Sequence, residues 1–182
     1  ATAARLGHNR GIYMQQAVPE GAGAMAAVLG LDRTEVDDLC NRCGGDLIVE
    51  VANVNAPGQV VVAGNTEAVN QLISMSREAG ARRAILLNVS APFHCSLMQP
   101  AAERLQKDLA EIEFADPRFP IVCNVTATSI TKGEAARVAL EKQVTQPVLW
   151  SETLEFLSAQ GVEVFVEVGP GRVLSGLVKR TL

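Results

Sequence analysis

His94 is the residue whose type and setting most favour chemistry. It comes after a β-prone apolar run, Ala84 to Val89, and after Pro92, which ends that run. It precedes a helical pattern with apolar residues at a spacing of four, at Leu97, Ala101, Leu105 and Leu109. A side chain at such a junction can reach a crevice at the edge of a sheet, where α/β folds bind ligands. A histidine beside apolar neighbours can carry protons near neutral pH. The pattern therefore makes His94 a candidate for catalysis, and it leaves open a histidine that only caps the helix or fills a gap.

Cys40 and Cys43 form the other motif that could carry chemistry, C-N-R-C. A zinc site would need two more ligands at suitable spacing, and none is near in the sequence. A redox C-x-x-C normally opens a helix after a strand, whereas this one closes a helical pattern. We therefore expect no metal site and no redox site, and a reduced protein of the cytoplasm.

Composition limits the classes of function. The net charge of −4 argues against a nucleic-acid surface, and no apolar run approaches the length that spans a membrane. The first residues do not have the pattern of a signal peptide, and we expect none. The hydrophobic fraction of 48%, with only 4% aromatic residues and 15 glycines, suits an α/β protein with close packing of helices on a sheet. Because the first residues lack a methionine and resemble the middle of a helix, we expect a piece of a longer product.

The elements that must position His94 fall into two groups. The first group, residues 21–90, has the order β-α-β-β-α-β of a ferredoxin-like unit. Its predicted strands are 25–29, 47–54, 59–63 and 84–89, and its helices are 32–40 and 66–78. This order predicts a four-stranded antiparallel sheet with both helices on one face.

The second group joins a helix over residues 1–16 to the chain that follows His94. Its predicted helices are 96–112, 133–142, 151–159 and 173–180, and its predicted strands are Phe119 to Val125 and Val162 to Val168. Strands that alternate with helices favour a parallel sheet.

Five segments of the chain resemble the malonyl-CoA:acyl carrier protein transacylases of bacterial fatty-acid synthesis. The segment around His94 reads S-A-P-F-H-C-S-L-M-x-P-A-A-E-x-L. The others, in the family's order, are R-G-I-Y-M-Q-Q-A-V-P-E-G-A-G-A-M-A-A-V-L-G from Arg10, V-A-N-V-N-A-P-G-Q-V-V-V-A-G from Val51, Q-P-V-L-W from Gln146 and E-V-G-P-G-R-V-L-S-G-L from Glu167. Together they extend over nearly all of the chain.

The resemblance implies an α/β fold in two parts. Residues 1–20 and 91–182 would belong to a large α/β-hydrolase-like subdomain, and residues 21–90 to an inserted ferredoxin-like subdomain. It also implies a two-step acyl transfer, in which a serine takes malonyl from malonyl-CoA and passes it to the phosphopantetheine thiol of acyl carrier protein. His94 would be the general base, and the backbone carbonyl of Gln143 would orient it.

The resemblance also implies which residues bind the acyl group. Arg10 would hold the malonyl carboxylate with two charge-assisted bonds, and Met14, one helical turn further, would line the pocket. Phe93 would crowd an α-methyl branch and so favour malonyl over methylmalonyl. Asn53 and Asn55 would lie in a turn beside the thioester. For each of these residues a purely structural role is the alternative.

One part of the family pattern is missing from these residues. The family's G-H-S-x-G nucleophile segment does not occur in the 182 residues, and no serine here stands in such a context. We therefore expect the C-terminal portion of a transacylase, inactive alone, and a monomer that uses no cofactor or metal. Its partners would be malonyl-CoA and acyl carrier protein, with no nucleic acid or membrane. The alternatives are a non-catalytic module that binds coenzyme A or carrier protein, and a fragment of a polyketide synthase acyltransferase domain.

Overall fold

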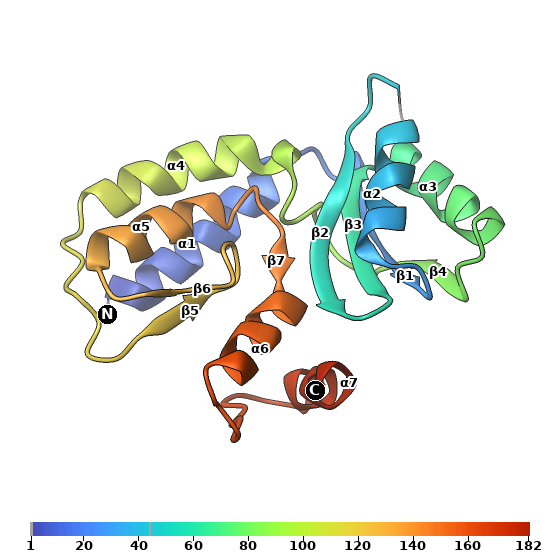
Figure 1. Cartoon of the computed structure of the whole chain (residues 1–182). Coiled ribbons are helices and arrows are strands. Elements are labelled where there is room, and N and C mark those ends of the chain that lie inside the picture. Colours follow the sequence, from blue (N-terminus) through green and yellow to red (C-terminus); the bar gives the residue numbers. More distant parts are fainter. Residues whose placement is uncertain (1, 44) are drawn as a thin grey trace.

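The computed structural model describes residues 2–43 and 45–182. It is a mixed α/β structure in which a five-stranded sheet lies beside a group of helices (Figure 1). The sheet has the order β4-β1-β3-β2-β7. Its strands are β1 (Gly23–Leu29), β2 (Val49–Ala56), β3 (Gln59–Asn65), β4 (Arg83–Leu86) and β7 (Val148–Leu149).

The first four strands of this sheet pair antiparallel, as the sequence predicts. β3 pairs with both β1 and β2, and β1 also pairs with β4. Helices α2 (Arg33–Arg42) and α3 (Thr66–Glu78) pack on one face, in a core that contains Val28, Val62 and Leu72. Asp32 caps α2 with a capping box, in which the Asp32 and Glu35 side chains each accept from the other's backbone N–H.

The opposite face of the sheet is covered by the chain around His94. Met25, Ala52, Val61 and Ala63 alternate with the residues that face α2 and α3, and they pack against Cys95 with Phe93 and Leu97. Both faces of the central strands are therefore buried, which explains the nearly continuous apolar sequence of β1 and β3.

The second body consists mainly of helices. It contains α1 (Thr2–Gln16), the 3₁₀ turn η1 (Ser96–Met98), α4 (Gln99–Ala110) and α5 (Gly133–Lys142), and Figure 1 shows α1, α4 and α5 side by side. Met14, Met98 and Leu105 belong to their shared core, and Phe93 packs against both this core and the sheet. The His94 turn therefore lies at the seam between the two bodies.

The predicted parallel sheet is wrong for the described residues. Residues 119–125 form only β5 (Ile121–Cys123), which pairs antiparallel with β6 (Thr128–Ile130) because a tight turn reverses the chain after Cys123. Residues 162–168 are extended but form no strand, since no described strand lies alongside to complete a hydrogen-bonded ladder. The one parallel pairing among the described strands joins β2 to β7.

The C-terminal residues lie below the other two groups in Figure 1. They form α6 (Trp150–Ala159), the extended residues 162–168 and α7 (Val173–Thr181). Among the described residues, no helix combines the length and apolar character that crossing a membrane requires.

Candidate active site

His94 lines a cavity between the sheet and the end of α5. The cavity has a volume of about 420 Å³. Its lining residues are Arg33, Asp37, Glu50, Val51, His94, Ser96, Gln99, Thr145, Gln146 and Pro147. Four segments of the chain, within residues 33–37, 50–51, 94–99 and 145–147, therefore line the same cavity as the histidine.

The backbone of His94 is in the left-handed region, with φ of 62°. A non-glycine residue rarely adopts this conformation, because its Cβ then crowds the following carbonyl group. The chain around it is held by hydrogen bonds from the backbone N–H of Phe93 to the carbonyl of Ala91 and from the thiol of Cys95 to the carbonyl of Pro92. The turn thus places the imidazole at the wall of the cavity, while Phe93 and Cys95 on either side of it pack in the core.

The imidazole of His94 contacts the backbone carbonyl of Gln143, with 2.7 Å between Nδ1 and the carbonyl oxygen. Because a carbonyl only accepts, this contact requires a hydrogen on Nδ1. In the neutral ring Nε2 then carries the lone pair, and the described residues give that nitrogen no hydrogen-bond partner. The sequence-based pairing of these two residues is thus present in the structure.

Gln143 is suited to this role by its place at the C-terminal end of α5. The last carbonyls of a helix have no intrahelical donor, so they can accept from elsewhere. The Gln143 side chain donates to the carbonyls of Gln146 and Pro147, at 3.0 and 3.2 Å, and so fastens the loop beyond the helix. A local network therefore fixes the carbonyl that His94 contacts.

Burial is the main influence on the charge of His94. It lowers the pKa of the imidazole, the Gln143 carbonyl opposes this shift, and the positive charge of Arg10 adds to it. The lowered pKa favours the neutral ring near neutral pH, which is the form that can accept a proton.

Arg10 is half-buried on α1, and burial lowers the pKa of its guanidinium group. No carboxylate among the described residues pairs with it. A partly desolvated cation without an anion is unfavourable by itself and attracts an anionic ligand. Arg10 does not line the cavity that contains His94, but its charge acts on the imidazole.

The other predicted site residues lie apart from the cavity. Met14 is buried in the helical core, and Phe93 packs at the seam between the bodies. Asn53 and Asn55 are half-buried residues of β2 and not of a turn, because the strand continues to Ala56. The turn assignment for these two asparagines is therefore wrong.

Cys95 is the nucleophile-type side chain next to His94 in sequence. It is fully buried, and its thiol donates to the carbonyl of Pro92. Burial raises the pKa of this thiol to about 12, so it stays protonated and unreactive near neutral pH. Cys95 is therefore a packing residue.

Glu50 and Ser96 line the cavity although no sequence pattern predicts either as a site residue. The Glu50 side chain accepts from the backbone N–H of Ser96 at 2.7 Å and from its hydroxyl at 2.8 Å. Ser96 follows His94 closely, but Glu50 is 46 residues earlier, and no local pattern connects the two.

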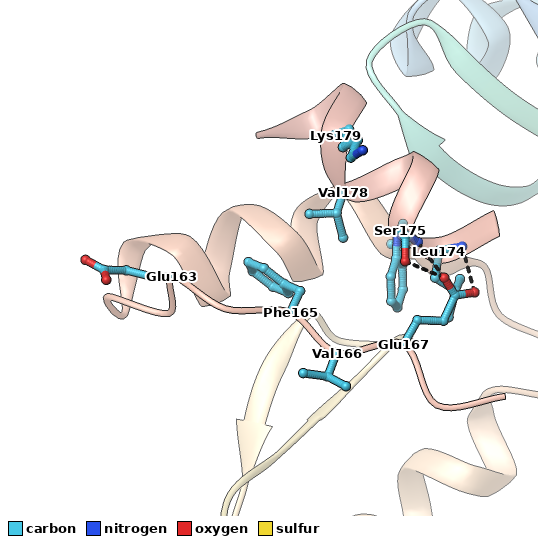
Figure 2. A pocket seen from close by; sticks show the side chains of 9 residues that line it. Glu163, Phe165, Val166, Glu167, Leu174, Ser175, Val178 and Lys179 are labelled. Carbon is cyan, nitrogen blue, oxygen red and sulfur yellow. Dashed lines mark hydrogen bonds between the residues drawn. The ribbon is translucent and has the colours of Figure 1, made fainter. Parts of the chain in front are cut away.

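A second cavity lies at the C-terminal end of the chain and contains none of the predicted residues (Figure 2). It has a volume of about 310 Å³ and is lined mostly by apolar side chains, among them Phe165, Val166 and Leu174. Glu167 accepts from the backbone N–H groups of Leu174 and Ser175 and from the Ser175 hydroxyl, which holds the start of α7. Glu167 and Ser175 thus serve the fold of this segment, and we take the cavity beside His94 as the candidate active site.

Comparisons with known proteins identify the family of the chain. The acyl transferase domain family matches residues 1–182. The malonyl CoA-acyl carrier protein transacylase of Escherichia coli K12 is 49% identical over 180 residues, which are 99% of this chain and 58% of that protein.

Solved structures give the same result. The malonyl CoA-acyl carrier protein transacylase of Coxiella burnetii superposes with a TM-score of 0.97 at 42% identity, over 99% of this chain and 57% of that one. A malonyl-transacylase in complex with a type II PKS acyl-carrier protein gives a TM-score of 0.95 at 49% identity, over 98% and 58%. The chain thus spans less than two thirds of the length of these relatives. Because the family match includes every residue and the relatives share up to 49% identity, the chain belongs to the acyl transferase domain family.

Proposed function

We propose that this chain supplies the base and the carboxylate-binding arginine of a malonyl transferase, which moves malonyl from malonyl-CoA to the phosphopantetheine thiol of acyl carrier protein. The contact between His94 and the Gln143 carbonyl is the observation that carries the proposal. It leaves Nε2 of a neutral imidazole free to take a proton at the cavity.

The proposed reaction has two halves. In the first, Nε2 of His94 takes the proton of a serine hydroxyl as its oxygen attacks the malonyl thioester, and the proton then goes to the thiolate sulfur of coenzyme A as the C–S bond breaks. In the second, Nε2 takes the proton of the phosphopantetheine thiol, whose sulfur attacks the serine ester, and the proton returns to the serine oxygen. The proposal needs no bound cofactor, because the phosphopantetheine arrives on the carrier protein.

The proposal assigns the nucleophilic serine to the part of the relatives' length that this chain does not span. Among the described residues, no serine is within hydrogen-bonding distance of the His94 ring. In this view residues 1–20 and 91–182 belong to an α/β-hydrolase-like large subdomain, and residues 21–90 form a ferredoxin-like insert. The antiparallel order β4-β1-β3-β2 supports the second assignment. The complete enzyme would be a monomer, and it would act in the cytoplasm, where soluble substrates such as malonyl-CoA occur.

Arg10 would bind the malonyl carboxylate. Its half-buried guanidinium has no anionic partner among the described residues, and its charge reaches the His94 ring. The carboxylate of the substrate would therefore be held near the base. Met14 would support the helix face that carries Arg10, since it is buried one turn further along α1. Phe93 would crowd an α-methyl branch on the substrate and so favour malonyl over methylmalonyl.

Two substitutions in the complete enzyme test whether His94 is the base and whether the backbone carbonyl of Gln143 orients it. We expect His94→Ala to lower the rate of malonyl transfer by about 10³-fold, because general-base catalysis contributes roughly 10²–10⁴-fold. Gln143→Ala should lower it less than about tenfold, because the carbonyl that contacts His94 belongs to the backbone. Initial rates with malonyl-CoA and carrier protein measure both effects. Wild-type rates for His94→Ala would contradict the proposal.

A further inference from the structure

Glu50 contacts the chain immediately after the candidate base. Its carboxylate, half-buried on β2, receives two hydrogen bonds from Ser96, one from the backbone N–H at 2.7 Å and one from the hydroxyl at 2.8 Å. Hydrogen bonds to an ionised acceptor are shorter and stronger than neutral ones. Both residues line the cavity that contains His94. The pair thus anchors the His94 turn to the sheet.

The turn needs such an anchor because of its backbone conformation. His94 has a positive φ, a conformation that persists only where the surroundings determine it strongly. On one side of the ring, the Gln143 carbonyl fixes Nδ1. On the other side, the Glu50 contacts hold the residue two positions further, at the start of the 3₁₀ turn.

We propose that Glu50 is a positioning residue for His94, which acts through Ser96 to keep the imidazole aligned with the Gln143 carbonyl. This inference rests on the proposed role of His94 as general base. Glu50 itself makes no contact with the ring. Its effect is on geometry, and a displacement of about 1 Å at a catalytic group can cost on the order of 10²-fold in rate.

Three substitutions in the complete enzyme separate geometry from charge. Glu50→Ala removes both acceptors and should lower kcat about tenfold to a hundredfold, while KM for malonyl-CoA changes less than about threefold. Glu50→Gln should restore most of kcat, because its amide oxygen can accept from the Ser96 N–H and its NH₂ can donate to the Ser96 hydroxyl. Ser96→Ala should have an intermediate kcat, since its backbone N–H still binds the carboxylate.

A spectroscopic measurement checks that the effect passes through His94. In nitrogen NMR spectra of the imidazole, the wild type should show a hydrogen on Nδ1, and Glu50→Ala should show a larger share of the tautomer with hydrogen on Nε2. If Glu50 only stabilised the first residue of the 3₁₀ turn, Glu50→Ala would not change this tautomer ratio. The matched control is Glu35→Ala, which removes a carboxylate that also accepts from a backbone N–H, at the start of α2. It should leave kcat and the tautomer unchanged.

The outcomes are distinct for this inference and for the proposed function. A wild-type kcat for Glu50→Ala would overturn the positioning role, and so would a Glu50→Gln variant as slow as Glu50→Ala, because the charge itself would then matter. If Glu50→Ala does not fold, Ser96→Ala decides, and a wild-type kcat and tautomer ratio in that variant would overturn the role. If His94→Ala is fully active, the proposed function fails, whatever the Glu50 variants show.

Discussion

At the scale of single residues, Arg10 is a half-buried cation whose anionic partner is not among the described side chains. In the complete enzyme, we expect Arg10→Ala to lower kcat/KM for malonyl-CoA about 10- to 100-fold, as for the loss of a charged hydrogen bond. The rate with acetyl-CoA should change less than about threefold, because acetyl has no carboxylate to bind. Transfer assays with both thioesters measure the ratio. Equal losses would show that Arg10 stabilises the fold and does not select the substrate.

The sequence predicted some residues of the candidate site and missed others for physical reasons. His94 stands where the pattern changes from strand to helix, and a family resemblance pointed to Gln143. Glu50 has neither signal, because its contact with Ser96 depends on the sheet packing against the turn. Long-range side-chain contacts of this kind leave no trace in local periodicity.

At the scale of elements, β2 and β3 approach closely at Gly64. A Cβ on this residue would be 2.1 Å from the carbonyl oxygen of Ile48. Gly64→Ala should therefore lower the free energy of unfolding by roughly 1–3 kcal/mol or more, because the backbone of Ile48 and Val49, where β2 begins, cannot yield as a flexible side chain can. Thermal or denaturant unfolding measures the change. Gly7→Ala is the control: it meets nothing within 4 Å and lies in a helix, where alanine is favoured, so a loss there equal to that of Gly64→Ala would refute the explanation.

Elements with local signals were predicted well, and those that depend on partners were not. The helices predicted over residues 32–40 and 66–78 correspond to α2 (Arg33–Arg42), which Asp32 caps, and to α3 (Thr66–Glu78). The valines of residues 162–168 have the composition of a buried strand, yet Val164, Val166 and Val168 are 77%, 79% and 94% exposed. Composition can indicate a strand, but a ladder requires a neighbour, which local sequence does not specify.

At the scale of the whole molecule, backbone protection should be uneven. In the 182-residue chain, the amides of residues 163–168 should exchange with deuterium much faster than those of Val60 to Ala63. The first group has no ladder among the described strands, whereas β3 is hydrogen-bonded on both sides and buried. Hydrogen exchange followed by mass spectrometry distinguishes the two segments. Equal protection would mean that residues 163–168 pair with another strand in solution.

The two segments that meet at the imidazole, the His94 turn and the end of α5, are both connected to β2. β2 binds the His94 turn through Glu50, and through Asn53 and Val54 it pairs with β7, which follows the loop that Gln143 fastens. Between these two attachments the register of β2 shifts by a bulge. A strand advances about 3.3 Å per residue, which exceeds the tolerance of a hydrogen bond. β2 therefore sets the spacing between these two attachments, and the residue added by its bulge contributes to the spacing at which His94 meets the carbonyl of Gln143.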